Sequence, residues 1–343
     1  MSVAALDAVD QLRQAWQQAH LVPLWESPTA HKPPAPPDPA YLWAWERIRP
    51  LIGRAIEVAD PAAVERRVLS LVNPRSRGPH DEATARTLAA AIQILLPGER
   101  ARPHRHSMNA VRFVLEGSGA FTIVDGKSCP MEVGDLILTP AWCWHEHVHR
   151  GSAPIIWLDA LDVPLHLYLG TAEFQSGPVT DLPETVPDSY FAVANVVPDI
   201  ALPSPVHSPV FRYPYQSAAA ALTAAPPARD GARRVRYVNP ATGGAAMTIL
   251  DMHLMQLDPG VTTRPLRTTS NAVVNVVEGS GESQVGGQTV RWQAKDIFTL
   301  PQGNRIVHRS NDGARLFVVS DRDALARLGL LRDEYGNDAG SSG

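Results

Sequence analysis

Residues 98–149 decide the fold; they begin with GERARPHRHSMNAVRFVLEG and close with GDLILTPAWCWHEHVH. His104 and His106 stand two positions apart, so on a β-strand both side chains project from the same face. The same parity continues through residues 108–114, a mostly apolar row that suits the interior of a barrel. A third histidine, His145, follows the apolar run LILTP and is expected on a later strand. Because three neutral imidazoles suit Fe(II), Zn(II), Cu(II) or Ni(II), this pattern predicts a metal site inside a small β-barrel.

The competing interpretation of these residues is a set of buried histidines with ordinary hydrogen bonds. For a lone histidine that explanation would be the better one, but a His-x-His pair with a third histidine on another strand favours metal ligands. Arg112 belongs to the same inward row, and a buried guanidinium is costly to desolvate unless an anion meets it. We expect Arg112 to hold the carboxylate of a bound substrate. The alternative is a structural ion pair with Asp159 or Glu116.

At these positions the chain resembles the cupin superfamily, and in particular its gentisate 1,2-dioxygenase branch. The two cupin motifs, G-x5-H-x-H and G-x5-P-x4-H, are present at Gly98, His104 and His106 and at Gly134, Pro140 and His145. Most cupins carry a glutamate ligand four or five residues after the His-x-His pair, where this chain has Ala110 and Val111. In lacking this glutamate, the chain resembles the branch with three histidine ligands, whose members cleave aromatic rings.

The resemblance implies a mainly β protein, a bicupin made of two cupin barrels, with one Fe(II) per chain in the N-terminal barrel. It implies that dioxygen and an aromatic 2-hydroxy acid are the reactants, and that gentisate is opened between C1 and C2 to give maleylpyruvate. The closest alternative is a salicylate 1,2-dioxygenase acting on salicylate or 5-substituted salicylates. Other classes left open are a non-oxidative metal cupin and a bicupin binding or storage protein. The family also suggests a homotetramer.

Further residues of the first barrel are expected to act beside the metal ligands. His147 lies two positions after His145 and shares its inward face; by resemblance it is an acid/base or hydrogen-bond donor near substrate and oxygen, so His147 and Arg112 are the expected catalytic residues. Gln93 is expected to line the substrate pocket. Asp159, embedded in the apolar run APIIWLDALDVP, is expected to orient a histidine in the second shell of the metal.

Three other features leave questions open. Arg66 and Arg67 are adjacent, and one of them could point into the pocket, but the sequence does not choose between them. His149 is expected to be a surface or rim residue. Typical gentisate enzymes carry an aromatic residue where this chain has residues 89–91, Ala-Ala-Ala, so a roomier pocket is expected and the preferred ring substituent stays open.

The second half of the chain repeats the first. PGERARPHRHSMNAVRFVLEGSGA aligns with PGVTTRPLRTTSNAVVNVVEGSGE, and GDLILTPAW aligns with KDIFTLPQG, which indicates two related barrels. The scaffold glycines and prolines persist while six polar positions are lost: His104 becomes Leu266, His106 Thr268, His145 Ile306, Arg112 Val274, Gln93 Met255 and Asp159 Ser320. These six are therefore the candidates for chemistry, and the second barrel is expected to bind no metal. His147 is retained in the second half as His308, which weakens the case that His147 takes part in the chemistry.

The expected organisation has five parts: residues 1–64 as an N-terminal helical arm, 65–165 as the metal-binding cupin, 166–240 as a crossover, 241–325 as a degenerate cupin and 326–343 as a tail. The arm is expected to hold one helix at residues 5–19 and another whose apolar side is Leu42, Trp45, Ile48 and Ile52. Asp60 and Pro61 are typical of a helix start. The tryptophans of the N-terminal arm, at positions 16, 25, 43 and 45, are expected in the core, with a subunit contact as the alternative.

Composition limits the remaining classes of partner. The formal net charge of −4 gives no basic face for nucleic acid, and no apolar run is long enough for a membrane span. The N-terminus lacks the basic-then-apolar order of a signal peptide, and two cysteines argue against a disulfide framework. We therefore expect a soluble cytoplasmic protein with no nucleic-acid or membrane partner. Cys143, close to a proposed ligand, is expected to be a wall residue and not a nucleophile.

Overall fold

The computed structural model describes residues 3–26, 36–59, 64, 66–76, 83–193, 196–201 and 206–336. The chain divides into two compact units, Met1–Pro36 and Pro37–Gly343. The first unit contains the expected helix, α1 (Val3–Gln18), and a short 3-10 turn, η1 (Leu24–Glu26). The ring of Trp16 meets that of Trp25 edge-on, yet Trp25 is 73% exposed, so the expectation of a core position is wrong for Trp25. Asp60 and Pro61 lie outside the described residues.

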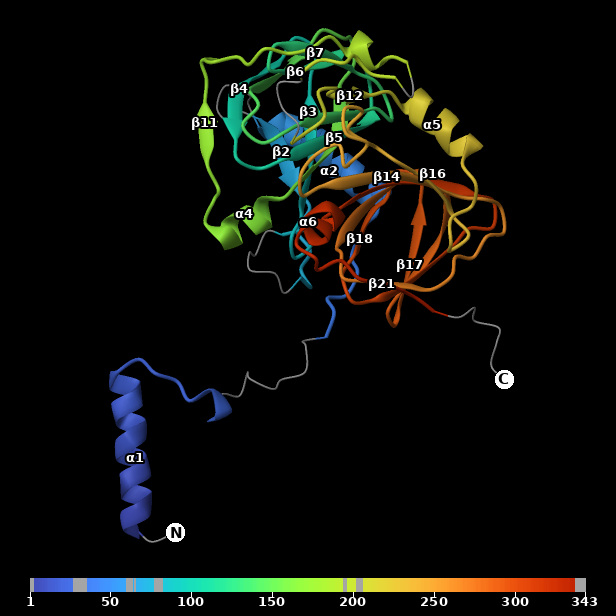
Figure 1. Ribbon diagram of the computed structural model, residues 1–343. Coiled ribbons are helices and arrows are strands. Elements are labelled where there is room, and N and C mark those ends of the chain that lie inside the picture. Colours follow the sequence, from blue (N-terminus) through green and yellow to red (C-terminus); the bar gives the residue numbers. More distant parts are fainter. Residues whose placement is uncertain are drawn as a thin grey trace. The chain divides into compact units, whose positions relative to one another are not determined.

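The second unit contains two β-barrels, as Figure 1 shows. The first barrel is built from a six-stranded sheet in the order β12-β8-β5-β10-β3-β2 and a five-stranded sheet in the order β11-β4-β9-β6-β7. Two of these strands, β11 (Phe174–Ser176) and β12 (Arg212–Tyr213), come from the segment that follows the barrel. The other strands are β2 (Arg67–Ser70), β3 (Ala89–Leu95), β4 (Arg100–His106), β5 (Ala110–Glu116), β6 (Ala120–Val124), β7 (Lys127–Met131), β8 (Leu136–Thr139), β9 (His145–His149) and β10 (Ile155–Leu161). Asp125 and Gly126 join β6 to β7 with positive φ angles of 43° and 82°, the geometry that the Asp-Gly sequence predicts for a tight hairpin.

The second barrel repeats this arrangement in a ten-stranded sheet. Its strands are β13 (Arg233–Arg236), β14 (Asp251–Leu257), β15 (Leu266–Thr268), β16 (Ala272–Val285), β17 (Gln288–Gln293), β18 (Ile297–Leu300), β19 (Arg305–Arg309) and β20 (Ala314–Ser320). Leu266 stands opposite Ile306, as His104 stands opposite His145 in the first barrel. The mainly β bicupin fold is therefore confirmed, together with the internal repeat.

The repeat continues beyond each barrel as a helix followed by a short strand. After β10 come α4 (Val163–Leu169) and β11 (Phe174–Ser176), which pairs with β4. After β20 come α6 (Arg322–Arg327) and β21 (Asp333–Tyr335), which pairs with β15. The expected crossover and tail thus each contribute a strand to the edge of a barrel sheet. The crossover also contains η2 (Asp188–Phe191), β12 (Arg212–Tyr213) and α5 (Tyr215–Ala224).

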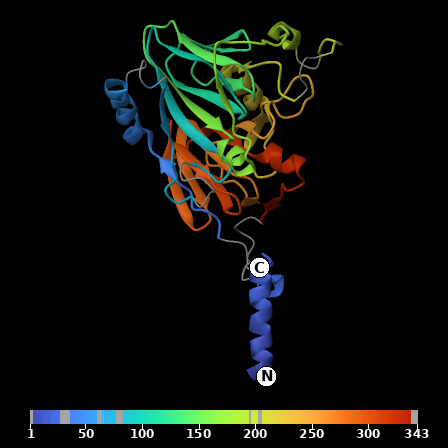
Figure 2. The ribbon, with the colours of Figure 1, turned by 90° about the vertical axis from the view of Figure 1, so that its left-hand side faces the viewer.

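One hydrophobic core cluster includes residues of both barrels, and a second cluster lies mostly within the C-terminal barrel. At the contact between the barrels the rings of Phe113 and Phe317 stack with centroids 4.1 Å apart. Leu42 lies in a short strand, β1 (Leu42–Trp43), that pairs with β18, whereas the sequence placed it on a helix. The helix that follows is α2 (Trp45–Val58), which Figure 2 shows on the outside of the strands. Trp43 and Trp45 are buried, as expected, so part of the expected arm belongs to the barrel unit. Among the described residues no helix combines the length and apolarity needed to cross a membrane.

Candidate metal centre and active site

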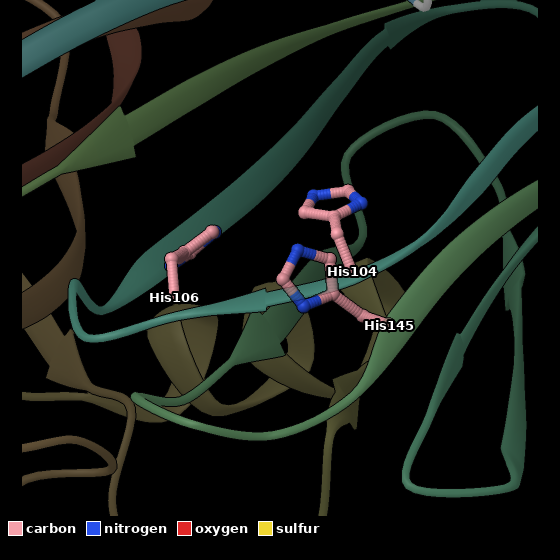
Figure 3. A group of neighbouring side chains, drawn as sticks. All are labelled: His104, His106 and His145. Carbon is pink, nitrogen blue, oxygen red and sulfur yellow. The ribbon is translucent and has the colours of Figure 1, made fainter. Parts of the chain in front are cut away.

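Three buried histidines converge inside the first barrel. His104 and His106 extend from β4 and His145 from the facing strand β9, and Figure 3 shows their rings turned toward one another. One ring nitrogen from each histidine lies within 4.8 Å of the others. Strand parity and the register of β4 against β9 bring together these side chains, which are separated by about forty positions in sequence.

Backbone carbonyl groups fix how each ring is protonated. The Nδ1 atoms of His104, His106 and His145 lie 2.8, 2.8 and 3.0 Å from the carbonyl oxygens of residues 102, 108 and 143. Because a carbonyl only accepts a hydrogen bond, each Nδ1 must carry the proton, and each Nε2 keeps its lone pair. This is the tautomer that binds a metal through Nε2.

The electrostatics of the site also suit metal ligation. Burial lowers the pKa of His104 to about 3 and that of His106 to about 4, and burial and the neighbouring charges hold the pKa of His145 well below its usual range. All three imidazoles are therefore neutral at pH 7, which is the form that ligates metals. The Nε2 atom of His145 is buried without a hydrogen-bond partner among the described residues. A bound cation would satisfy it, so this donor set fits a divalent transition metal.

A cavity of about 260 Å³ opens beside His106. Its walls include residues 89–91, three alanines of β3, together with Gln93 and Arg112. The Nε2 atom of Gln93 is buried and has no hydrogen-bond partner in the described part of the chain. The volume of the cavity lies just below the roughly 300–1,000 Å³ range of small-molecule sites, which suits a single substituted ring.

Arg112 and Asp159 form a buried ion pair across β5 and β10. Nε of Arg112 lies 3.2 Å from Oδ1 of Asp159, and Nη1 of Arg112 donates to Oγ1 of Thr139 at 2.6 Å. The second carboxylate oxygen accepts a hydrogen bond from Nε1 of Trp157 at 3.1 Å. Burial lowers the pKa of Arg112 and raises that of Asp159, and the attraction between the pair opposes both shifts. The ion pair that the sequence left as an alternative is present, and the guanidinium also lines the cavity.

Asp159 therefore has other partners than the histidine that the sequence predicted. Its side chain contacts Arg112 and Trp157, while backbone carbonyls orient the three metal-facing rings. The residue of the second barrel that is equivalent to Asp159 also differs from the one that the sequence alignment predicted. Asp159 stands opposite Arg112, and the counterpart of Arg112, Val274, stands opposite Val318, so Val318 and not Ser320 is the structural equivalent of Asp159.

His147 is fully buried next to the triad. Its Nδ1 lies 3.0 Å from the hydroxyl of Thr122, and its ring centroid lies 5.2 Å from the Trp157 ring. Its Nε2 has no partner among the described side chains, and burial holds its pKa well below the usual value. His149, in contrast, is not a rim residue. It is buried, with Nε2 2.7 Å from the carbonyl of Ala153, and it holds the turn after β9.

The structure also shows which of Arg66 and Arg67 faces the cavity. Nη1 of Arg66 donates to Nε2 of His104 at 2.9 Å, and its side chain lines the cavity. Arg67 instead makes two 2.7 Å hydrogen bonds to the carboxylate of Glu99, away from the cavity lining. Arg66 is thus the member of the pair that faces the site.

Two more residues complete the surroundings. The ring of Phe174, on β11, stacks on His104 with centroids 5.4 Å apart; the sequence gave Phe174 no role, and only the pairing of β11 with β4 reveals it. Cys143 is buried, with Sγ 3.8 Å from Nε2 of His207. Burial raises its pKa well above the usual range, so the thiol stays protonated, in keeping with the expected wall residue.

Comparison with known proteins places this geometry in a family. The cupin domain family matches residues 91–161. Gentisate 1,2 dioxygenase 1 of Aquipseudomonas alcaligenes is 36% identical over 91% of this chain and 92% of its own length. The 5-aminosalicylate 1,2-dioxygenase of a Comamonas species is 34% identical over 95% of this chain and 90% of its own.

Among solved structures, the salicylate 1,2-dioxygenase of Pseudaminobacter salicylatoxidans superposes with a TM-score of 0.87 at 30% identity, covering 96% of this chain and 97% of that one. The similarity thus spans both barrels as well as the metal-binding stretch. With the histidine triad and the cavity beside it, these matches identify an enzyme, and the chain belongs to the gentisate 1,2-dioxygenase family of bicupin ring-cleaving dioxygenases.

Proposed function

We propose that this enzyme is Fe(II)-dependent and cleaves gentisate with dioxygen between the carboxyl-bearing C1 and the hydroxyl-bearing C2, giving maleylpyruvate. The observation that carries the proposal is the set of three neutral, buried imidazoles whose ring nitrogens converge beside a cavity that is lined by Arg112. One iron per chain would be held by His104, His106 and His145. When bound, the iron supplies the redox chemistry that lets dioxygen react with an aromatic ring.

The chain's own residues bind and orient the substrate in this proposal. Arg112 holds the substrate carboxylate through a charge-assisted pair, and Asp159 positions its guanidinium. Arg66 would lose its hydrogen bond to Nε2 of His104 if that atom held a metal, and its guanidinium would then be available for the same carboxylate. Gln93, whose amide nitrogen has no partner within the described residues, donates a hydrogen bond to a substrate oxygen.

His147 is proposed as a hydrogen-bond donor or proton acceptor near the triad, since its ring centroid lies 6.3 Å from that of His145. Its neutral ring is fixed by Thr122, and its Nε2 is available for a proton at a substrate or dioxygen oxygen. The persistence of a histidine at the equivalent position of the second barrel also fits a structural role. A His147→Gln variant separates the two: loss of kcat with an unchanged unfolding temperature supports the chemical role.

A salicylate 1,2-dioxygenase is the second candidate, and the alanine wall favours it. Residues 89–91 all line the cavity, which leaves room beside the ring. Relatives are named for gentisate, 5-aminosalicylate and 1-hydroxy-2-naphthoate, so ring substituents vary among proteins with this degree of similarity. A homotetramer and a cytoplasmic location complete the proposal and rest on the family resemblance.

The deciding experiment is oxygen uptake by the enzyme after anaerobic loading with Fe(II), with gentisate, salicylate and 5-substituted salicylates compared side by side. Uptake with gentisate and loss of iron from His104→Ala, His106→Ala and His145→Ala would support the proposal. The control is His20→Ala, since His20 lies in the N-terminal unit and should not affect iron content. Oxygen uptake with salicylates but not with gentisate would favour the second candidate, a salicylate 1,2-dioxygenase. Bound iron without uptake would favour a non-oxidative cupin.

A further inference from the structure

The second barrel encloses a cavity of its own, of about 190 Å³. It lies at the position that corresponds to the metal-site region of the first barrel. Where the first barrel has histidines, its wall has Leu266, Thr268 and Ile306, and Met255 and Val318 add more apolar surface. This wall offers no set of imidazoles to a metal. It offers a dry, shaped surface that suits an apolar ligand group.

Polar groups gather in the same lining. His308 is buried, and its Nδ1 lies 2.8 Å from the hydroxyl of Ser283. This arrangement matches that of His147 with Thr122 in the first barrel. No hydrogen bond to Nε2 of His308 is found within the described residues, although the side chain lines the cavity. A second histidine, His253, lines it as well, and burial lowers its pKa to about 4, so it is neutral.

The charged lining residues include two ion pairs. Arg234 and Arg322 line the cavity together with two carboxylates, Asp230 and Asp333. Arg234 forms a two-point ion pair with Asp230, and Arg322 forms one with Asp333 on β21. These pairs hold the guanidinium groups in place at the wall. A preorganised cluster of guanidinium groups beside neutral histidines is the usual protein partner of a carboxylate.

We propose that the C-terminal barrel binds a small monocarboxylate with an apolar body, of the size of benzoate, at a site separate from the metal centre. The ring lies against Leu266, Ile306 and Val318, and the carboxylate lies toward His308 and Arg322. The cavity is smaller than the 260 Å³ of the first barrel, which favours a single ring without large substituents. The site has no metal ligands at the repeat positions, so it binds this ligand without converting it.

The first experiment measures how many benzoate molecules each chain binds. Equilibrium dialysis of radiolabelled benzoate against the full-length, iron-loaded enzyme is compared with Val318→Phe, which fills the cavity. The matched control is Val307→Phe, since Val307 is half-buried in the same barrel and does not line the cavity. Wild type and Val307→Phe should each bind one benzoate per chain more than Val318→Phe. Equal stoichiometry in all three proteins would overturn the proposal.

The second experiment tests the charge requirement. Arg322→Met combined with Asp333→Asn removes the cation without leaving its carboxylate unpaired. Benzoate bound to the second site should weaken about tenfold or more, whereas the neutral probe benzyl alcohol should bind as before. Unchanged benzoate binding, or equal weakening of both probes, would contradict a carboxylate site. Because the readout is binding and not turnover, failure of the proposed dioxygenase activity leaves this test unaffected.

Discussion

Arg66 and Arg67 are neighbours in the chain, yet their guanidinium groups serve different parts of the molecule. Arg66 donates to Nε2 of His104 at the edge of the cavity, whereas Arg67 pairs with Glu99 through two 2.7 Å hydrogen bonds. Arg67 begins β2, and successive side chains at a strand point to opposite faces. Arg66 therefore belongs to the candidate active site, whereas Arg67 forms a structural ion pair.

Replacing Arg66 should change substrate binding, whereas replacing Arg67 should change stability. Arg66→Ala should raise the apparent substrate constant by about tenfold, because a charge-assisted pair contributes on the order of 1.5–3 kcal/mol, and should leave the free energy of unfolding little changed. Arg67→Ala should lower that free energy by about 3 kcal/mol, since it leaves a partly buried carboxylate without its partner. Steady-state kinetics and urea unfolding of both variants check the prediction. The same phenotype in both would refute the assignment.

Removing the guanidinium of Arg112 should weaken substrate binding and also disturb Asp159. Arg112→Gln should raise the substrate constant about tenfold or more, and it should destabilise the fold because Asp159 stays buried without a cation. Adding Asp159→Asn should restore much of the stability but none of the affinity. Unfolding curves and kinetics of the single and double variants separate these effects. An unchanged substrate constant in Arg112→Gln would remove its carboxylate role.

The buried histidine of the second barrel should make stability depend on pH. Burial lowers the pKa of His308 to about 4 in the folded chain, against about 6.5 in the unfolded chain. Between these values the unfolded chain takes up a proton that the folded chain does not, so stability is retained above pH 6.5 and falls as pH decreases toward 4. The difference corresponds to roughly 3 kcal/mol. His308→Gln should flatten this decline in urea unfolding measured from pH 7 to 4, whereas the exposed control His20→Gln should not.

Much of the site could be predicted because it depends on the alternation of side chains along a single strand. The two-residue spacing of His104 and His106 fixes their common face, and the fold family fixes the strand of His145. The repeat pointed to the same side chains, since the structural positions of Leu266 and Ile306 match two of them. No register across strands was needed for these predictions.

The partners of Asp159 and Phe174 depend on register and crossover pairing, which single-sequence patterns do not contain. Asp159 meets Arg112 only because β10 lies beside β5. Ile306 lies 161 positions after its counterpart His145, but Val318 lies 159 positions after Asp159, because the segment between the two positions is two residues shorter in the second barrel. A constant offset therefore misplaced that equivalence. Phe174 reaches His104 through a strand of the crossover that has no strong pattern of its own.

The repeat allows a direct test of what the metal site requires. Leu266→His with Thr268→His places two imidazoles on β15 but leaves Ile306 opposite them, so this double variant should gain no metal site of comparable affinity. Adding Ile306→His completes the triad at matching register, and it should raise the iron content from one to two per chain. Oxygen uptake should not rise with it, because Val274 and Val318 replace the Arg112–Asp159 pair. Elemental analysis and oxygen uptake of the double and triple variants measure both outcomes. Metal binding by the double variant would mean that two histidines suffice in this barrel, and extra turnover in the triple variant would mean that the triad alone, without an arginine, supports the reaction.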